Sequence, residues 1–254
     1  IRDSSTSRGL GDVYKRQSQI KIAIERKNGI SKVKVFRSND FINIKKYLKS
    51  LDYDNKPYLF YSSVLGTNYD KKLIKILESF FEKITAFKST RSLLSTTNSY
   101  KKASNLGSDR WAQIVAAKSI FKKDCVIVSC GSAISIDCVT KNGIHKGGLI
   151  MSGAEGYLNC FSDIHNLKNI KLTQTKKNNL LQTDTVGQIN VGYRTMITAS
   201  VHKVYEEFKK NTKSKPTIIV SGSYARQIAS YIKINSLVEP FFVLKSLAYI
   251  KRSV

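Results

Sequence analysis

Two short segments carry the residues whose types and spacing could do chemistry. The first is 106–111, with the sequence LGSDRW, which sets a carboxylate beside a guanidinium directly after a glycine. The second is 129–133, SCGSA, which has the composition of a strand that runs into a turn of small residues. Backbone N–H groups in such a turn can approach an anion closely. Together the two segments favour a phosphotransfer site of the kinase type.

Asp109 is the candidate catalytic base of such a site. Moving a phosphoryl group to an alcohol requires a cradle for the phosphates, a divalent ion, and a group that positions or deprotonates the hydroxyl. At the start of a helix Asp109 would benefit from the macrodipole, and we expect Ser108 to be the N-cap. Arg110 could hold a substrate carboxylate by paired hydrogen bonds. An Asp and an Arg at a helix start are also common surface capping residues, which leaves a structural interpretation open.

Two glycine turns are candidates for contacts with a nucleotide. Gly131 permits close backbone approach and Ser132 adds a hydroxyl donor after a buried strand. The segment 221–223, SGS, lies at a strand-to-helix junction and could face adenine or phosphate. Ordinary strand turns and helix caps have the same composition, so both motifs have a structural alternative. The glycines of 147–153 are expected to serve packing.

The elements expected around these segments alternate between strands and helices. Residue periodicity predicts a hairpin over 19–25 and 32–36, and a Ser- and Thr-rich loop precedes the 106–111 segment. After that segment the strand pattern restarts. The remaining predicted helices are 41–51, 70–81, 109–121, 185–210, 224–232 and 244–251, and the remaining strands 58–61, 84–87, 126–129, 133–139, 145–151 and 217–220. We therefore expect two mixed α/β domains that meet near residue 112, with a ligand in the cleft between them.

Composition limits the class of protein. The chain has 254 residues, of which 41% are apolar, enough to bury a sizeable core. The formal net charge of +25 raises the alternative of a nucleic-acid-binding module. The lysines, however, are spread in pairs along the chain, and the aromatic-plus-basic motifs of RNA-binding sheets are missing. No apolar run approaches the length of about 20 residues that spans a bilayer. We therefore expect a cytoplasmic protein with no nucleic-acid or membrane partner.

The cysteines and histidines do not have the spacing of a metal site. Cys125, Cys130, Cys138 and Cys160 form no Cys-x-x-Cys pair, and three of them lie in apolar, strand-like runs. Buried free thiols in a reducing compartment fit this pattern best. The three histidines are far apart in the sequence, so we expect no zinc site.

Residues 1–17 are expected to be a non-native leader. They are polar and aperiodic, and the stretch 7–17 resembles translated sequencing-adapter sequence. We therefore assign 18–112 to an N-terminal domain and 113–254 to a C-terminal domain.

The order of the motifs resembles that of the type III pantothenate kinases. Tyr100 is followed by LGSDRW at 106–111, SCGSAISID at 129–137 and GIHKGGLI at 143–150. The resemblance covers nearly the whole chain from Ser18 onward. It implies an actin-like, sugar-kinase-like fold of two ribonuclease-H-like domains, and a homodimer. It also implies ATP-dependent phosphorylation of pantothenate, the first step toward coenzyme A, with Mg²⁺ and with K⁺ or ammonium as ions.

The resemblance also assigns roles residue by residue. Asp109 matches the catalytic base, and the substrate-binding positions are matched by Tyr100, Gly107, Ser108, Arg110 and Thr185. Gly131 and Ser132 match the ATP-contacting turn, where Ser132 replaces a threonine and keeps its hydroxyl. Ser129 replaces an aspartate that in many relatives binds a monovalent cation, so the resemblance does not carry that site over intact.

One departure concerns the start of the chain. Family members begin with a strand and a D-x-G-N-T phosphate loop, which would align with 14–18, where this chain has YKRQS. We therefore expect the polypeptide as written to lack its first core strand and the acidic group of that loop, and the sequence leaves open whether the chain is active without them. A non-catalytic accessory or regulatory relative of the same fold is the alternative function.

Overall fold

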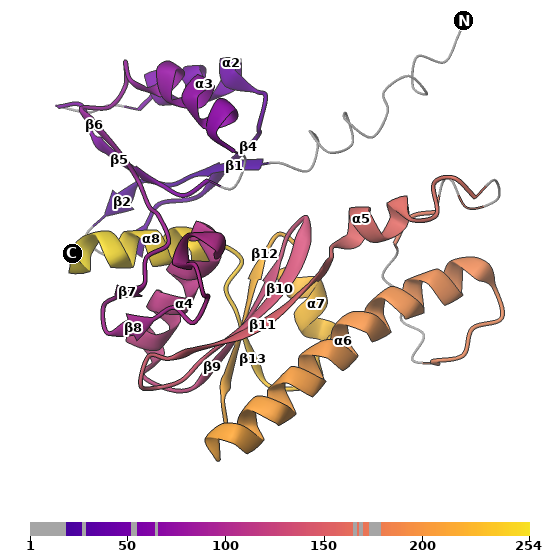
Figure 1. The fold of residues 1–254 in the computed structure, drawn as a ribbon. Coiled ribbons are helices and arrows are strands. Elements are labelled where there is room, and N and C mark those ends of the chain that lie inside the picture. Colours follow the sequence, from indigo (N-terminus) through magenta and orange to yellow (C-terminus); the bar gives the residue numbers. More distant parts are fainter. Residues whose placement is uncertain are drawn as a thin grey trace, which may run out of the picture.

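The C-terminal half of the chain is built on a five-stranded mixed sheet (Figure 1). The computed structural model describes residues 19–26, 29–51, 55–63, 66–164, 167, 170–172 and 179–254, so the expected leader lies outside the described residues. The strands are β9 (Cys125–Cys130), β10 (Ala133–Val139), β11 (His145–Ser152), β12 (Thr217–Gly222) and β13 (Ser236–Val238). Their order is β11-β10-β9-β12-β13. Strand β10 is antiparallel to β9 and β11, whereas β12 is parallel to β9 and β13.

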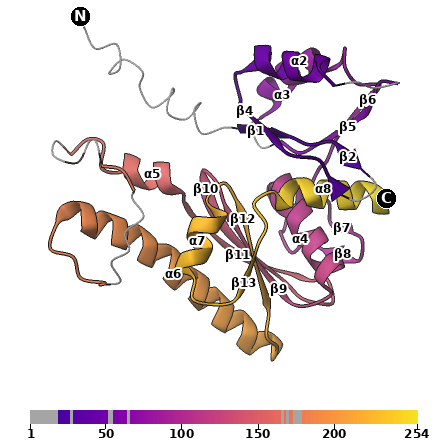
Figure 2. The same cartoon turned by 180° about the vertical axis from the view of Figure 1, so that it is seen from behind.

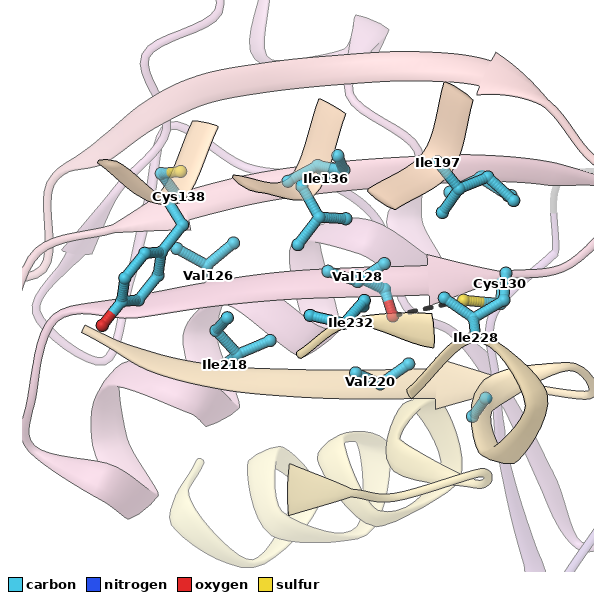
Figure 3. Packing of buried hydrophobic residues seen from close by; sticks show 14 of the residues in the cluster. Val126, Val128, Cys130, Ile136, Cys138, Ile197, Ile218, Val220, Ile228 and Ile232 are labelled. Atoms are coloured by element: carbon cyan, nitrogen blue, oxygen red, sulfur yellow. Dashed lines mark hydrogen bonds between the residues drawn. The ribbon is translucent and has the colours of Figure 1, made fainter. Parts of the chain in front are cut away.

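Helices cover both faces of this sheet, which is why β9, with the sequence CVIVSC, is almost entirely apolar. The helices of the first face are α6 (Thr185–Thr212) and α7 (Ala225–Tyr231), and those of the second are α4 (Ser108–Phe121) and α8 (Phe242–Ser253). Figure 3 shows the first face, where Val126 and Val128 of β9 pack with Ile197 of α6 and Ile228 of α7. Trp111 and Ile127 belong to the core of the second face.

The N-terminal half has two principal strand pairs beneath two helices (Figure 2). Its principal elements are β1 (Gln19–Ile22), β4 (Lys34–Arg37), α2 (Phe41–Lys49), β5 (Tyr58–Tyr61), α3 (Thr67–Leu77) and β6 (Lys83–Ala86). Strands β1 and β4 are antiparallel, and β5 and β6 are parallel. Both pairs pack with Ile44 and Leu48 of α2 and Leu77 of α3 in one core cluster.

The two halves follow the same plan, except at one strand. The antiparallel pair β1 and β4 corresponds to β10 and β11, and the parallel pair β5 and β6 corresponds to β12 and β13. The central strand β9 has no counterpart within the part of the N-terminal half that the structure describes. The mixed α/β architecture of two related halves is therefore confirmed, with a central position of the first sheet unfilled by the described residues.

The remaining elements are short connections. They are β2 (Glu25–Arg26), β3 (Gly29–Ile30), β7 (Ser92–Leu93), β8 (Thr96–Thr97), the 3₁₀ turn η1 (Ala103–Asn105) and α5 (Ala154–Asn159). Helix α3 ends at Leu77, earlier than the periodicity predicts, and β13 and α5 were not predicted. Residue 112 lies inside α4, and the division of the chain into domains at that residue stays a prediction.

Two chemical expectations can be compared with this fold. Cys125, Cys130 and Cys138 are buried free thiols, as predicted, and Cys160 is exposed. Burial raises the pKa of each of the three buried thiols to about 12, so they stay protonated near neutral pH. In the described ranges, no helix is long and apolar enough to cross a membrane.

Candidate active site

A cavity of about 620 Å³ lies between the two halves of the chain. Strands β1 and β5 and helices α2 and α3 contribute to one side of it, and α4, β9, β10, β12 and α8 to the other. The predicted site residues that line it are Asp109, Arg110, Ser129, Gly131 and Ser132. The two segments with chemistry-bearing residues therefore meet at one hollow, as expected for a ligand site between two packed units.

Asp109 lies in the first turn of α4, at the wall of this cavity. Its Oδ1 accepts a hydrogen bond of 2.8 Å from the backbone N–H of Arg110. Burial raises the pKa of Asp109 above its usual range and the charge of Asp137 adds to the rise, although the N–H and the charge of Arg110 oppose it. A carboxylate with a raised pKa is a stronger proton acceptor than an ordinary aspartate, which fits the predicted role of a base.

Arg110 is held by a buried carboxylate of its own chain. Its Nε and Nη2 donate to Oδ2 and Oδ1 of Asp137 at 2.8 and 2.6 Å, and its Nη1 donates to the hydroxyl of Tyr100 at 3.2 Å. Burial alone would lower the pKa of Arg110, but the hydrogen bonds and the charge of Asp137 raise it. The paired hydrogen bonds predicted for a substrate carboxylate thus go to Asp137, and a ligand must use the other N–H groups of Arg110.

Asp137 and His145 lie behind Arg110 and Tyr100. Oδ1 of Asp137, on β10, is 3.2 Å from Nε2 of His145, on β11. Burial alone would raise the pKa of Asp137, but the hydrogen bonds from His145 and Arg110 outweigh burial and lower it. The ring of His145 stacks on that of Tyr100, with centroids 5.9 Å apart and an angle of 18° between the planes. Sequence reasoning assigned no site role to Asp137 or His145, because a single acidic residue in a strand and a lone histidine give no spacing signal.

The turn that leads into α4 is anchored to the N-terminal half. The hydroxyl of Ser108 is 2.7 Å from that of Ser62 and donates to the backbone carbonyl of Ser63 at 3.3 Å. Helix α4 begins at Ser108, its N-cap is Gly107, and no side chain caps it. The predicted N-cap role of Ser108 was therefore wrong, because its hydroxyl bonds across the cavity wall to the residues after β5. This contact ties the Asp109 turn to the opposite half.

The Gly131–Ser132 turn is open to the cavity. The N–H of Gly131 donates to the carbonyl of Ala133 at 3.0 Å within the turn. A Cβ at Gly131 would come only within 3.7 Å of that carbonyl, so the chain itself does not require a glycine there and a closely approaching ligand could. Gly222 differs, since its φ is 98° and a Cβ would lie 2.1 Å from the carbonyl oxygen of Cys130. The glycine of the SGS segment is thus needed for packing.

Lys21 is a cavity residue that sequence reasoning missed. Its Nζ donates to the hydroxyl of Ser223 at 3.2 Å and lies 5.9 Å from the ring centroid of Phe241. Burial lowers the pKa of Lys21. In the sequence, a lysine between Ile20 and Ile22 indicates the solvent-exposed face of an amphipathic strand. In the structure this face of β1 lines the cavity, because residues of the second half lie opposite it.

The sequence model of the type III pantothenate kinases matches residues 17–207. The chain belongs to the type III pantothenate kinase family. Among relatives that carry this name, one from Sulfurihydrogenibium sp. (strain YO3AOP1) is 25% identical, over 80% of this chain and 80% of its own. One from Thermosipho melanesiensis is 24% identical, over 84% of this chain and 90% of its own. One from Hahella chejuensis is 36% identical, over 37% of this chain and 39% of its own.

A solved structure from Campylobacter jejuni has the same fold. That protein is described as a conserved Baf family transcriptional activator. It superposes with a TM-score of 0.61 at 19% sequence identity and covers 89% of this chain and 92% of its own. At this level of identity the likeness concerns the fold and not the activity.

Ser129 does not reproduce the monovalent-cation position that the family resemblance implies. Its hydroxyl donates to Oε1 of Gln113 at 3.1 Å, and Nε2 of Gln113 donates to the backbone carbonyl of Asp109 at 3.3 Å. The hydroxyl is therefore engaged, and no carboxylate stands at this position. Across the described ranges, no cluster of three or more His, Cys, Asp or Glu side chains could hold a metal. We assign no step of the reaction to a monovalent cation.

The structure does not bring Thr185 to the cavity. Thr185 is the first residue of α6, next to the N-cap Asp184, whose carboxylate accepts a hydrogen bond of 2.7 Å from the N–H of Gly187. Thr185 is not among the residues that line the cavity. Figures 1 and 2 both show the N-terminal end of α6 far to the side of α4. The predicted pantothenate contact of Thr185 is thus not made within one subunit's cavity.

Proposed function

We propose that this type III pantothenate kinase family member transfers the γ-phosphoryl group of ATP to the hydroxyl of pantothenate, the first step toward coenzyme A. The observation that carries the proposal is Asp109, a carboxylate with a raised pKa at the wall of the cavity between the two halves. The family resemblance assigns the role of base to this residue, which lies in the first turn of α4. The names of the relatives from Sulfurihydrogenibium and Thermosipho support the choice of substrate.

Asp109 accepts the proton of the attacking alcohol. As the pantothenate oxygen bonds to the γ-phosphorus, the bond from that phosphorus to the departing ADP oxygen breaks, and the hydroxyl proton passes to the Asp109 carboxylate. The N–H groups of Arg110 that Asp137 leaves free bind the carboxylate end of pantothenate, together with Tyr100, which the family resemblance assigns to the substrate although it is not among the residues that line the cavity. With its carboxylate end held in this way, pantothenate is oriented with its hydroxyl toward the γ-phosphate and within reach of Asp109.

Three polar side chains of the cavity suit the phosphates of ATP. Lys21 supplies a positive charge, and Ser132 and Ser223 supply hydroxyl donors. Mg²⁺ neutralises phosphate charge when it is bound, and it is commonly held by substrate phosphates and water with few protein carboxylates. That habit agrees with the lack of an acidic cluster among the residues described here.

We further propose that the enzyme is a cytoplasmic homodimer. The family resemblance assigns a pantothenate contact to Thr185, which lies away from the cavity of its own subunit. In a dimer, Thr185 of the partner subunit would complete the site. The three buried free thiols suit a reducing compartment, where they stay reduced.

Substitution of Asp109 tests the reaction directly. Asp109→Asn keeps the shape of the side chain but removes the base, and we expect kcat for pantothenate-dependent ADP formation to fall by about 100-fold or more. Pantothenate binding, measured by isothermal titration calorimetry, should change only a few-fold. The matched control is Asp163→Asn, at an exposed carboxylate after α5, which should leave both values unchanged. Persistent turnover in Asp109→Asn would show that another group is the base.

The same assays separate the alternative functions. A non-catalytic accessory relative would bind ATP without pantothenate-dependent ADP formation. A nucleic-acid-binding module, which the net charge of +25 leaves as a competing idea, would bind random duplex DNA with a steep dependence on salt. We expect pantothenate-dependent turnover and no duplex binding near physiological salt.

A further inference from the structure

Two buried residues that have no assigned role lie directly behind the side chains expected to meet pantothenate. Asp137 is 1% exposed and His145 is 0% exposed, and they come from the neighbouring strands β10 and β11. A buried carboxylate is costly unless its oxygens are paired. Both oxygens of Asp137 are paired, Oδ2 with Nε of Arg110, and Oδ1 with Nη2 of Arg110 and Nε2 of His145.

His145 makes one side-chain hydrogen bond, and that bond is to Asp137. Its Nδ1 is buried and has no hydrogen-bond partner among the described residues. The histidine therefore keeps one ring nitrogen unsatisfied, which is uncommon for a buried polar group. Because Asp137 is ionised, the Nε2 atom must carry the proton that it shares with Oδ1. The one bond that His145 forms thus fixes the Asp137 carboxylate.

His145 also supports Tyr100 from two directions. Its ring stacks on the Tyr100 ring, and its backbone carbonyl accepts a hydrogen bond from the hydroxyl of Ser99, the residue before Tyr100. The Tyr100 hydroxyl in turn accepts from Arg110. Asp137 and His145 therefore hold the two proposed substrate contacts, Arg110 and Tyr100, in one fixed arrangement.

We propose that Asp137 and His145 are positioning residues that hold Arg110 and Tyr100 in place to bind the carboxylate end of pantothenate. The proposal rests on the proposed function for the identity of the ligand. Arg110 has five N–H groups, and three of them are used by Asp137 and Tyr100. The planar, two-bonded contact with Asp137 fixes the direction of those that remain. The charge of Asp137 also offsets part of the effect of Arg110, whose own charge lowers the pKa of the neighbouring Asp109.

Three variants of the full chain separate positioning from packing. Asp137→Asn keeps the volume but loses the charge and one acceptor. His145→Gln keeps an N–H that can reach Asp137, whereas His145→Leu fills the space without a donor. We expect the pantothenate Kd, measured by calorimetry, to rise about tenfold or more in Asp137→Asn and several-fold in His145→Leu. His145→Gln should stay within about twofold of the original chain. In turnover, the KM for pantothenate should rise while the KM for ATP stays unchanged.

A spectroscopic readout tests the positioning without any substrate. The Nε–H proton of Arg110, observed by ¹H–¹⁵N NMR, should exchange slowly with water in the original chain and in His145→Gln, because this proton is hydrogen-bonded to the buried Asp137 carboxylate. It should shift or broaden in Asp137→Asn. If Asp137→Asn does not fold, Asp137→Glu displaces the carboxylate by one methylene group and should weaken pantothenate binding and shift the same signal.

The outcomes distinguish this proposal from the proposed function. If the original chain binds no pantothenate, the proposed function fails, and the Arg110 signal alone still decides the positioning role. Unchanged pantothenate affinity and an unchanged Arg110 signal in Asp137→Asn would overturn the role of Asp137. Equal effects of His145→Leu and His145→Gln would overturn the role of the His145 hydrogen bond.

Discussion

Asp109 combines two demands that oppose each other at the scale of a single residue. Burial raises the pKa of its carboxyl, so the folded state binds a proton at Asp109 more tightly than the unfolded state does. At neutral pH, where the carboxyl is ionised, Asp109 therefore lowers the stability of the fold, and this loss disappears as pH falls through the raised pKa. The same raised pKa makes the ionised carboxylate a better base.

Because the ionised Asp109 carboxylate destabilises the fold at neutral pH, we expect Asp109→Asn to raise the midpoint of thermal unfolding at pH 7. The increase should shrink at acidic pH, where the native carboxyl is already protonated. Thermal unfolding followed by circular dichroism at both pH values measures it. Asp163→Asn, at an exposed position, should leave the midpoint unchanged. A lower midpoint for Asp109→Asn at pH 7 would contradict the destabilising role of the charge.

The reactivity side predicts an acidic limb in the pH profile of kcat/KM. The base works only when deprotonated, so the rate should fall as pH drops through the pKa of Asp109, at a higher pH than an exposed aspartate would give. Initial rates of ADP formation across pH measure this limb. A profile that stays flat down to the ordinary pKa of an aspartate would mean that a different group takes the proton.

Lys21 permits a prediction about the nucleotide alone. It is bonded to Ser223 in the cavity and its charge is proposed to face the phosphates. Lys21→Gln should raise the KM for ATP by about tenfold and leave the KM for pantothenate unchanged, since charged hydrogen bonds contribute about 1.5–3 kcal/mol. Lys83→Gln, at an exposed position of β6, is the control and should change neither constant. Equal effects on both substrates would place Lys21 elsewhere in the mechanism.

At the scale of elements, the strand pairs β1-β4 and β5-β6 are separate sheets, whereas the corresponding strands of the other half are joined by the central strand β9. Strand β1 pairs only with β4, and β5 only with β6, among the strands that the structure describes. In the C-terminal half the corresponding position is filled by β9, which precedes β10 by the short turn at Gly131. An apolar strand placed directly before β1, as β9 lies directly before β10, could pair with the edges of β1 and β5 that the described strands leave unpaired.

This correspondence predicts the result of a graft. Replacing residues 11–16, GDVYKR, with a copy of β9, CVIVSC, should raise the unfolding midpoint by several degrees, because an apolar strand at that place can form hydrogen bonds to both β1 and β5. Hydrogen exchange should show new protection of the β1 and β5 amides. In a control graft, proline replaces the second valine. Proline has no backbone N–H to donate to a neighbouring strand, so this graft should lose most of the increase in the unfolding midpoint. Equal midpoints for the two grafts would rule out strand pairing.

Sequence patterns gave the elements of the C-terminal half well, because a sheet covered on both faces requires continuous apolar strands such as β9. They missed β13, whose residues Ser236–Val238 are too few for a periodic signal, although it completes the sheet. Asp109 could be predicted as a site residue from the sequence, because it lies in a recognisable motif at 106–111. The roles of Lys21 and Asp137 depend on contacts between residues far apart in the chain, and no local pattern encodes those contacts.

At the scale of the whole molecule, Thr185 tests whether the site is shared between subunits. It lies outside the cavity of its own subunit, yet the family resemblance assigns it a contact with pantothenate. Both statements hold together if two copies associate so that each Thr185 completes the other copy's cavity. A closed dimer with twofold symmetry would create two such sites. Thr185→Ala alone should then lower kcat/KM for pantothenate by about tenfold, through a lost hydrogen bond.

Co-expression of two variants decides between a shared and a private site. In a mixed dimer of Asp109→Asn with Thr185→Ala, one cavity combines an intact Asp109 with an intact Thr185 from the other subunit. Random pairing of equal amounts should therefore restore about a quarter of the original activity, far above the sum of the two variants alone. If Thr185 served its own cavity, no combination would restore an intact site and the mixture would show only the residual activity of Thr185→Ala. Sedimentation of the mixture checks that both variants form dimers, so a lack of restoration in mixed dimers would refute the shared site.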